Sequence, residues 1–300
     1  MRMRRTGCGT WCYTWRVMGR DNITLPASSS FPLFQYPLFP FQKLTFVCAE
    51  RGRGGGLEKF FGPEAWECYW AMQGTNGSYT WGPDAKLSPL GHAEVARTAT
   101  AWSLQIEDGI PLPTSHHVSP LSRSLSTLVE TWSSIELDPP RPVCNELLRE
   151  TLNLHYGDKR SPASYLREMY PQVDFPIEEE DPLWNYHRES EAGRNLRIEQ
   201  VLNEILGRDM ETYIAMTSHS GVINSTLVAL GHRPYALQTA GVLPVVVKVE
   251  KDLTWNGEPV WRREEEWEVP EVEFRSVCPG YSPVLISGRY ENGMGVWLQS

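Results

Sequence analysis

The stretch Tyr213-Ile-Ala-Met-Thr-Ser-His-Ser-Gly221 decides the fold class of this 300-residue chain. Its first five residues form a nearly continuous apolar run, which is typical of a strand covered on both faces in a parallel sheet. A Ser-His-Ser-Gly turn ends the run. Val222, Ile223 and Leu227 then recur at the spacing of a helix face, and Gly231 is a stop signal. The stretch therefore predicts a strand, a turn and a helix in direct succession.

The rest of the chain repeats this alternation. We expect strands at 43–47, 116–118 and 242–249, and helices at 88–104, 119–132 and 197–206. Alternating strands and helices favour a three-layer α/β fold, with a mostly parallel central sheet flanked by helices. Ligands of such sheets bind beyond the carboxyl ends of the strands. The functional site is therefore expected at the junctions after Val47, Val118 and Thr217.

Shifts in composition suggest how the chain is organised. Residues 1–42 are expected to form an irregular arm, and residues 43–250 a single α/β domain. The polar, proline-interrupted stretch 151–195 is expected to form a cap over the crevice, and 251–300 an extension packed on the same domain. One further helix is expected after a glycine-rich turn, containing the aromatic residues Phe60, Phe61, Trp66 and Trp70.

Charge and cysteine content exclude several classes of protein. The formal charge is -9, from 28 Lys+Arg against 37 Asp+Glu, so nucleic acid is not an expected partner. The six cysteines show no Cys-x-x-Cys pair, and no cluster has metal-ligand spacing, so neither a metal nor a cofactor is expected. Scattered thiols suggest a reducing compartment. No run of about 18 apolar residues occurs, so we expect a cytoplasmic protein that does not enter a membrane.

Arg123 is the first residue that could take part in chemistry. Ser119 and Pro120 have the pattern of an N-cap and first residue of a helix, which places Arg123 in the first turn. A cation there opposes the helix dipole, at a cost of about 0.3–1 kcal/mol. The placement is favourable if an anion lies between the guanidinium and the free N–H groups. A salt bridge or a solvated side chain is the alternative.

His219 and Glu150 are two further candidates. His219 follows the most apolar strand, and Ser220 and Gly221 leave open backbone N–H groups beside it. A carboxylate such as Glu150, if near a phosphate, can act as a general acid. Each residue also has an ordinary explanation, a structural histidine at a strand end and a solvated glutamate.

Several motifs in order resemble the histidine phosphatase superfamily, in the phosphomutase-like, phosphoglycerate-mutase-like branch common in fungi. The motifs are Gly62-Pro-Glu-Ala-Trp-Glu-Cys-Tyr-Trp70, Trp81-Gly-Pro-Asp-Ala-Lys-Leu-Ser-Pro-Leu-Gly91, Ser119-Pro-Leu-Ser-Arg123, Leu148-Arg-Glu-Thr151, Asp158-Lys-Arg160, His187-Arg-Glu189 and Ser218-His-Ser-Gly221. The resemblance covers roughly residues 43–250, and implies a phosphoglycerate-mutase-like fold and a small phosphorylated substrate.

The resemblance also implies roles for the candidate residues. Arg123 matches the arginine that grips the phosphoryl oxygens, and His219 matches the second histidine, which hydrogen-bonds the transferring group. Glu150 matches the acid that protonates the leaving alcohol. Cationic groups around a loose transition state are what phosphoryl transfer requires. Ser220 is expected to help bind the substrate from the turn.

One family motif is missing. The resemblance requires Arg-His-Gly directly after the first strand, where the histidine becomes phosphorylated, but Cys48 and Ala49 stand there. No histidine precedes His92. Three explanations remain open: a pseudoenzyme that has lost phosphoryl transfer, different chemistry in the same pocket, or a local error in the deduced sequence.

The segment around the missing motif offers no clear substitute. The glycines of 52–56 lack the Lys-Ser/Thr of a phosphate-binding P-loop. Cys48 could act as a thiolate near Arg51, but a small buried side chain is the alternative. Arg51 and Arg53 could add positive charge to the pocket. The adjacent pair His116-His117 is expected to be structural or to line the rim.

The expected activity is therefore that of a phosphoglycerate-mutase-like phosphatase, acting on a small phosphomonoester and impaired by the missing nucleophile. One alternative is a non-catalytic protein that binds an anion or a partner. Another is a repurposed pocket for an acidic small molecule, possible in fungal secondary metabolism, which rests on analogy alone.

Overall fold

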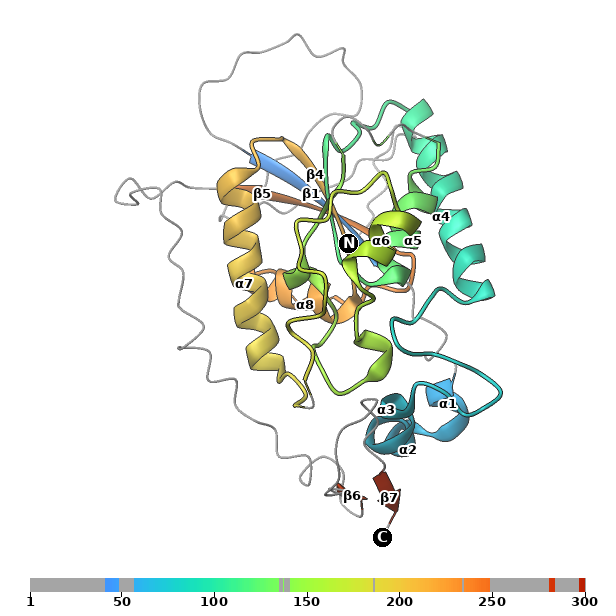
Figure 1. Ribbon diagram of the computed structural model, residues 1–300. Coiled ribbons are helices and arrows are strands. Elements are labelled where there is room, and N and C mark those ends of the chain that lie inside the picture. The colour runs from blue at the N-terminus through green and yellow to red at the C-terminus, as the bar shows by residue number, and fades with distance from the viewer. Residues whose placement is uncertain are drawn as a thin grey trace, which may run out of the picture.

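A five-stranded sheet forms the centre of the computed structural model (Figure 1), in the order β3-β2-β4-β1-β5. The structure describes residues 41–48, 57–134, 137, 141–185, 187–233 and 235–248, and the short pair β6 (Tyr281–Pro283) and β7 (Trp297–Gln299). The strands of the main sheet are β1 (Phe41–Cys48), β2 (Ser115–Val118), β3 (Val143–Cys144), β4 (Tyr213–Ser218) and β5 (Val242–Lys248). β1 to β4 run parallel and β5 runs antiparallel to β1.

The register brings the three expected junctions to one edge of the sheet. Thr217 of β4 lies opposite Val47 of β1 on one side and opposite Val118 of β2 on the other. The carboxyl ends of three neighbouring strands therefore end at the same level. This geometry confirms the mostly parallel sheet and brings the three expected junctions together at its carboxyl edge.

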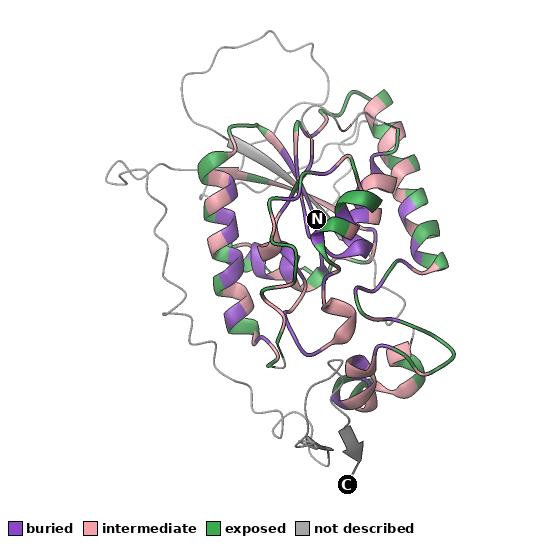
Figure 2. Cartoon of the chain, in the orientation of Figure 1, coloured by how far each residue is buried: buried purple, intermediate pink, exposed green. Residues whose placement is uncertain are grey.

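Helices cover both faces of the sheet (Figure 1), which gives the predicted three layers. Successive side chains of a strand point to opposite faces. Ile214 and Met216 pack with the apolar side chains of α7 (Glu191–Arg208) and α8 (Ser220–Ala229). Ala215, on the other face, packs with Leu125 and Leu128 of α5 (Ser122–Thr131). Figure 2 shows the resulting buried and exposed stripes along α7.

The ends of α4 (Pro89–Glu107) and α8 are set by the expected local signals. The Ser88 hydroxyl accepts a hydrogen bond from the backbone N–H of Gly91 at 3.1 Å, as an N-cap does. At the end of α8, Gly231 has a φ of 64°. The N–H groups of Gly231 and His232 donate to the carbonyls of Val228 and Leu227. This is a Schellman ending, which favours glycine.

The prediction that Ser119 is the N-cap of α5 is wrong. The helix spans Ser122–Thr131, so Ser119 lies outside it and the capping position is Leu121. The carboxylate of Asp84 replaces the cap, because it accepts from the backbone N–H and the hydroxyl of Ser122, both at 2.7 Å. It also accepts from the N–H of Ser161 at 3.2 Å. An Asp far away in sequence therefore satisfies the helix end.

The aromatic segment is not the single helix that its sequence suggested. It is divided into α1 (Leu57–Phe61), α2 (Pro63–Ala65), a π-helical turn (Trp66–Trp70) and α3 (Ala71–Gln73). Gly62 interrupts it with a φ of 85° and a ψ of 153°, a conformation that only glycine adopts readily, and Pro63 then restarts the helix.

The segment between α5 and α7 is mostly irregular. It contains β3, two 3-10 turns (Glu146–Leu148 and Tyr156–Asp158) and α6 (Ala163–Met169). α7 starts at Glu191, earlier than the predicted 197, because the hydroxyl of Ser190 caps it by accepting from Gly193 N–H at 3.1 Å. The proposed domain boundaries, including the cap at 151–195, remain predictions.

The structure bears on two expectations drawn from composition, those on the cysteines and on membrane-spanning helices. Cys144 is a free, buried thiol, whereas Cys68 is disulfide-bonded, contrary to the expectation of separate thiols throughout. Among the described helices, none combines the length and the apolar character that crossing a membrane requires.

Replacing Asp84 should test how much this remote cap stabilises the fold. Asp84→Ala leaves three buried donors without their acceptor and places alanine at a φ of 52°, so we expect a loss of about 2–4 kcal/mol in unfolding free energy. Asp84→Asn keeps an acceptor and tolerates positive φ, and should lose less. Chemical denaturation measures both, with the exposed Asp108→Ala as control. An Asp84→Ala variant as stable as the control would contradict the cap.

Candidate active site

His219 and Ser119 meet at the carboxyl edge of the sheet. Ser119 directly follows β2 and its N–H donates to the Thr217 carbonyl at 3.1 Å, while His219 directly follows β4. The imidazole Nε2 of His219 lies 2.9 Å from the Ser119 hydroxyl, and both side chains are buried. His219 also occupies the N-cap position of α8. The Ser119-Pro120 motif therefore contributes a partner for the histidine rather than a helix cap.

Arg123 is buried in the first turn of α5, where its guanidinium reaches the segment after Glu150. Its Nη2 donates to Asp158 Oδ1 at 2.8 Å and its Nη1 donates to the Gly157 carbonyl at 3.1 Å. Arg188 binds the other oxygen of the same carboxylate at 3.3 Å. Arg123 thus forms a salt bridge, which was the alternative to binding an external anion. Because Arg123 and Arg188 share the single carboxylate of Asp158, the three side chains together retain positive charge.

The shared carboxylate stays ionised despite being enclosed. Burial alone would raise the pKa of Asp158, but the neighbouring Arg123 and Arg188 guanidiniums outweigh it and lower this pKa to about 2. Asp158 is thus an anion throughout the physiological pH range and holds both arginines in place.

His219 is neutral in this environment. Complete burial, and then the positive charge of Arg123, lower the pKa of its imidazole well below 6.5. A neutral imidazole can donate one hydrogen bond, and Nε2 is the atom that faces Ser119. The site can therefore offer a donor from His219 and a positive charge from Arg123 to the same small anion.

The carboxyl of Glu150 lies close to the first residues of α8. Its Oε1 accepts from the backbone N–H of Thr151 at 3.0 Å. A Cβ built on Gly221 would be only 2.6 Å from this Oε1 and 3.2 Å from Nη1 of Arg194, so glycine is needed for the close approach. The structure therefore brings Glu150 beside the turn that contains His219.

Three buried arginines fix the backbone that places Glu150 and Asp158. Arg197 forms two hydrogen bonds of 2.7 and 2.6 Å with Glu189, and its remaining donors bind the carbonyls of Leu147, Arg149 and Glu150. Arg149 binds the Asp181 carboxylate at 2.6 and 2.8 Å and the Asp158 carbonyl at 2.7 Å.

Arg160 completes this support. It binds Glu146 at 2.6 Å and four backbone carbonyls, which belong to Glu178, Glu179, Glu180 and Ser161. The side chains of all three arginines are fully buried. Guanidinium donors thus satisfy an irregular segment whose carbonyls have no sheet or helix partners.

Sequence reasoning did not assign a role to several residues of this site. Asp158, Arg188, Glu189 and Ser119 lie within motifs quoted for the family resemblance, whereas Arg194 lies outside those motifs. The motifs were a usable signal for the first four. Nothing local in the sequence distinguishes Arg194 from any other helical arginine.

Other predicted site residues have different outcomes. Ser220 is the first residue of α8 and is exposed. Arg51, Arg53 and Ala49 lie outside the described residues, and Cys48 is described only as the last residue of β1, opposite Ser218. His116 packs edge-on against the ring of Trp132.

His117 is also structural. Its Nε2 lies 2.8 Å from Asp209, which precedes β4 at the edge of the sheet away from His219. Neither histidine of the adjacent pair is therefore assigned to the pocket by its contacts.

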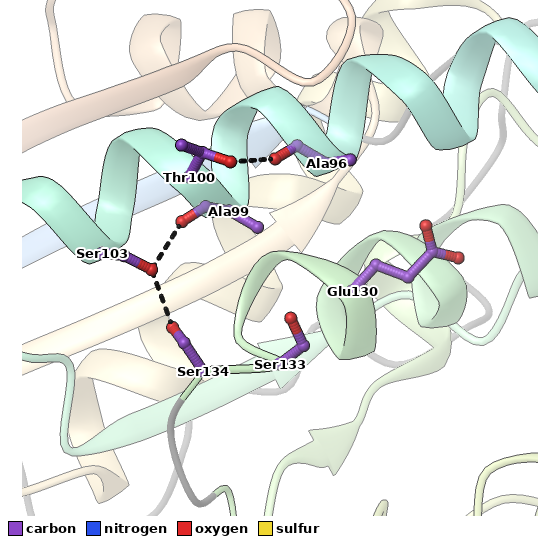
Figure 3. Close-up of a pocket in the computed structure, with 7 residues that line it drawn as sticks. All are labelled: Ala96, Ala99, Thr100, Ser103, Glu130, Ser133 and Ser134. Atoms are coloured by element: carbon purple, nitrogen blue, oxygen red, sulfur yellow. Dashed lines mark hydrogen bonds between the residues drawn. The ribbon is translucent and has the colours of Figure 1, made fainter.

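A separate shallow groove lies between α4 and the end of α5 (Figure 3), with a volume of about 400 Å³. Small residues line it, and the Ser103 hydroxyl donates to Ser134 across it at 3.2 Å. None of the predicted site residues lines this groove. In the described part of the chain, no group of three His, Cys, Asp or Glu side chains could hold a metal ion.

Removing a buried arginine should test the support of the site. Arg197→Met leaves the Glu189 carboxylate buried without its ion-pair partner, held only by the N–H of Leu152, and removes the guanidinium donor from three carbonyls. We therefore expect a loss of about 3–5 kcal/mol in unfolding free energy. Arg208→Met removes an exposed arginine of the same helix and should cost less than about 0.5 kcal/mol. Denaturant titrations measure the unfolding free energy of both variants. Equal losses would show that Arg197 supports the fold no more than an exposed arginine does.

Acid should destabilise the protein through its buried histidines. The pKa is about 4 for His116, lowered by burial and then by His117, and is also below 6.5 for His219. Between the folded and unfolded pKa values the unfolded chain binds more protons, so stability falls as the pH drops below about 6.5. The maximum slope is about 1.4 kcal/mol per pH unit for each histidine.

His219→Asn removes one of these titrating groups. The loss in unfolding free energy between pH 7 and pH 5 should therefore be smaller in this variant than in the unsubstituted chain. Urea titrations at both pH values provide the measurement, and equal losses would show that His219 is not buried as a neutral group.

Comparison with known proteins places this site in a family. Residues 67–243 match the model of the histidine phosphatase superfamily (branch 1). The match begins downstream of β1, and so downstream of the position of the missing motif.

Two fungal relatives are similar in sequence. A probable phosphoglycerate mutase of Arthroderma benhamiae is 37% identical over 199 residues, which are 64% of this chain and 59% of the relative. A probable phosphoglycerate mutase of Saccharomyces cerevisiae is 33% identical over 216 residues, 63% of this chain and 72% of the relative. The chain thus spans less than two thirds of the length of the Arthroderma protein.

A solved structure of a mycobacterial glucosyl-3-phosphoglycerate phosphatase is 18% identical, with a TM-score of 0.41, and the match covers 69% of this chain and 90% of the other. The family model alone spans more than half of the chain, and the yeast relative is matched over more than two thirds of its length. This chain therefore belongs to the histidine phosphatase superfamily, branch 1, among its phosphoglycerate-mutase-like members.

Proposed function

We propose that the site binds the phosphoryl group of a small phosphomonoester between His219 and Arg123. The observation that supports this most directly is the contact of the neutral His219 imidazole with Ser119, next to a buried arginine that shares its counter-ion. The phosphoryl oxygens would take the place of the Ser119 hydroxyl beside Nε2, with His219 in the tautomer that has its proton on Nε2. The first N–H groups of α8 add donors from the same side.

Glu150 would protonate the departing alcohol in this proposal. Its carboxyl lies against Gly221, the second residue of α8, and thus within one turn of His219. Ser220, exposed at the start of the helix, would help to bind the substrate, as would Arg51 and Arg53.

Turnover should be weak because the chain has no histidine at the position of the family nucleophile. Without that group, the phosphoryl cannot be transferred to the protein and released in a second step. Water would have to attack phosphorus directly: the new oxygen–phosphorus bond forms, the bond to the alcohol breaks, and the alcohol oxygen takes a proton from Glu150. Both protons of the water leave with the dihydrogen phosphate product, and Glu150 is left as a carboxylate that solvent reprotonates.

The same absence favours a second function, in which the pocket binds a phosphorylated or otherwise acidic small molecule without turnover. His219, Arg123 and Asp158 form an anion pocket whose geometry does not depend on the missing residue. A cytoplasmic location and a role in secondary metabolism remain predictions.

Hydrolysis of a generic aryl phosphate tests both functions. Under the proposal, the chain shows slow turnover, and Arg123→Ala and His219→Ala each reduce it by at least about 10²-fold. The double variant Cys48→Arg/Ala49→His should raise the rate well above that of the chain. His92→Ala, on exposed α4, is the matched control and should leave the rate unchanged.

The other outcomes are equally informative. Binding of inorganic phosphate without turnover, if lost in Arg123→Ala, supports the non-catalytic function. Turnover that neither alanine variant affects would show that the reaction does not use this pocket, and would overturn the proposal.

A further inference from the structure

Residues 171–177 run along the outer edge of the main sheet, and we call them the edge segment. Among the described strands, β3 is the last on its side of this sheet. The N–H of Cys144 donates to the carbonyl of Asp174, and the N–H of Asp174 donates to the carbonyl of Pro142, both at 2.8 Å. Asp174 thus pairs with Val143 as a residue of a parallel strand does. The edge segment therefore has one side toward β3 and one side away from the sheet.

The backbone pattern defines which groups of the edge segment point away from the sheet. In an extended chain the N–H and C=O groups of one residue point to the same side, and those of its two neighbours point to the opposite side. Because Asp174 faces β3, Val173 and Phe175 present their backbone groups outward. Their side chains are buried in the apolar core beside α5, which fixes this orientation. Outward groups of this kind, when they are unpaired, are a template for another strand.

Every second carbonyl of the edge segment accepts a hydrogen bond from a guanidinium group. These carbonyls belong to Pro171, Val173, Phe175 and Ile177. Nη2 of Arg141 donates to the first two, and its distance from the second is 3.3 Å. Nη2 of Arg167, which belongs to α6, donates to the other two at 3.0 and 3.3 Å. Two arginines therefore occupy the acceptors that an incoming strand would use.

The first outward N–H groups are also withheld from a partner. Pro171 has no N–H group, and the N–H of Val173 donates to the carbonyl of Tyr170 at 3.0 Å. Proline and charged side chains are the devices by which natural proteins protect the edges of their sheets. The donors of the backbone thus follow the same rule as its acceptors at this edge.

Both arginines remain partly in solvent. Their side chains are 37% and 48% exposed, and their carboxylate partners, Asp174 at 2.9 Å and Glu179 at 3.7 Å, are about half exposed. An open groove of about 640 Å³ is lined by both arginines and by the edge segment. Ion pairs as exposed as these contribute little to stability. What the two guanidiniums exclude from this edge explains their position better than what they stabilise.

We propose that Arg141 and Arg167 close this edge of the sheet against a second copy of the chain. Open edge strands of two identical chains can pair, because a two-fold axis brings the same edge of both copies together. A second copy would have to displace four guanidinium hydrogen bonds before its own N–H groups could reach these carbonyls. The proposal is independent of the phosphoryl pocket and of the proposed function.

The double variant Arg141→Ser/Arg167→Ser tests this role, because it leaves the four carbonyls without their guanidinium donors. Sedimentation equilibrium should show that it self-associates at least about tenfold more tightly than the unsubstituted chain. The substitutions also make a chain of net charge -9 more acidic, which by itself opposes self-association. Tighter association would therefore not be an effect of charge.

Hydrogen exchange shows where such copies meet. The backbone amides of residues 171–177 should exchange more slowly as the concentration of the double variant rises, and its infrared spectrum should gain a band of intermolecular β-sheet. Arg97→Ser/Arg208→Ser is the matched control, because it removes two exposed arginines from α4 and α7. It should associate no more tightly than the unsubstituted chain.

Several results would overturn the proposal. One is a double variant that keeps its near-ultraviolet circular dichroism and associates no more tightly than the control. Another is association without slower exchange at residues 171–177, because the copies would then meet elsewhere. If the double variant loses its native circular dichroism, the single variants Arg141→Ser and Arg167→Ser decide, since each leaves two carbonyls open. Association of neither single variant beyond that of Arg97→Ser would refute the role of the two arginines.

Discussion

Three buried guanidinium groups hold the irregular segment on which the whole site depends. Between Asn145 and Arg160 the chain has only short 3-10 turns, so most of its carbonyls cannot be satisfied by regular structure. Arg149 and Arg197 donate to carbonyls of this stretch, and Arg160 donates to the carbonyls of Ser161 and of residues 178–180. Each of the three arginines also binds a carboxylate. A planar fork with five N–H groups suits this task, and neither lysine nor an apolar side chain could replace it.

This arrangement has a consequence for the site. A buried ion pair contributes little net stability compared with apolar packing, but removing one partner is costly. The arginines therefore fix the position of Glu150 and Asp158 with little tolerance for displacement. Phosphoryl transfer relies on positioning and charge, so a rigid support of this kind suits the family to which the chain belongs.

The charge state of the site depends on Asp158 and His219. Asp158 holds two arginines, and burial keeps His219 neutral beside them. The result is a group of side chains with surplus positive charge and a neutral imidazole, which suits the small anion proposed to bind there. All of these residues follow β1 in the chain, so in the proposed function the binding of the anion is separable from catalytic power.

Local signals in the sequence determined the regular elements. The apolar run at 213–217 predicted the central strand, Ser88 predicted the start of α4, and Gly231 predicted the end of α8. The parallel order of the strands then followed from alternation with helices, and the site from the shared edge of the strands. The family resemblance added the roles of Arg123, His219 and Glu150, which remain proposals.

Only the tertiary structure decided which polar groups pair with one another. Ser119 stands in the sequence pattern of a helix N-cap, yet its hydroxyl contacts His219, one hundred residues away. The N-terminal N–H group of α5 is bound instead by the carboxylate of Asp84. The partners of Arg197 could not be read from sequence either. Caps and periodicity depend on neighbours in the chain, whereas the pairing of buried charges depends on which segments the fold brings together.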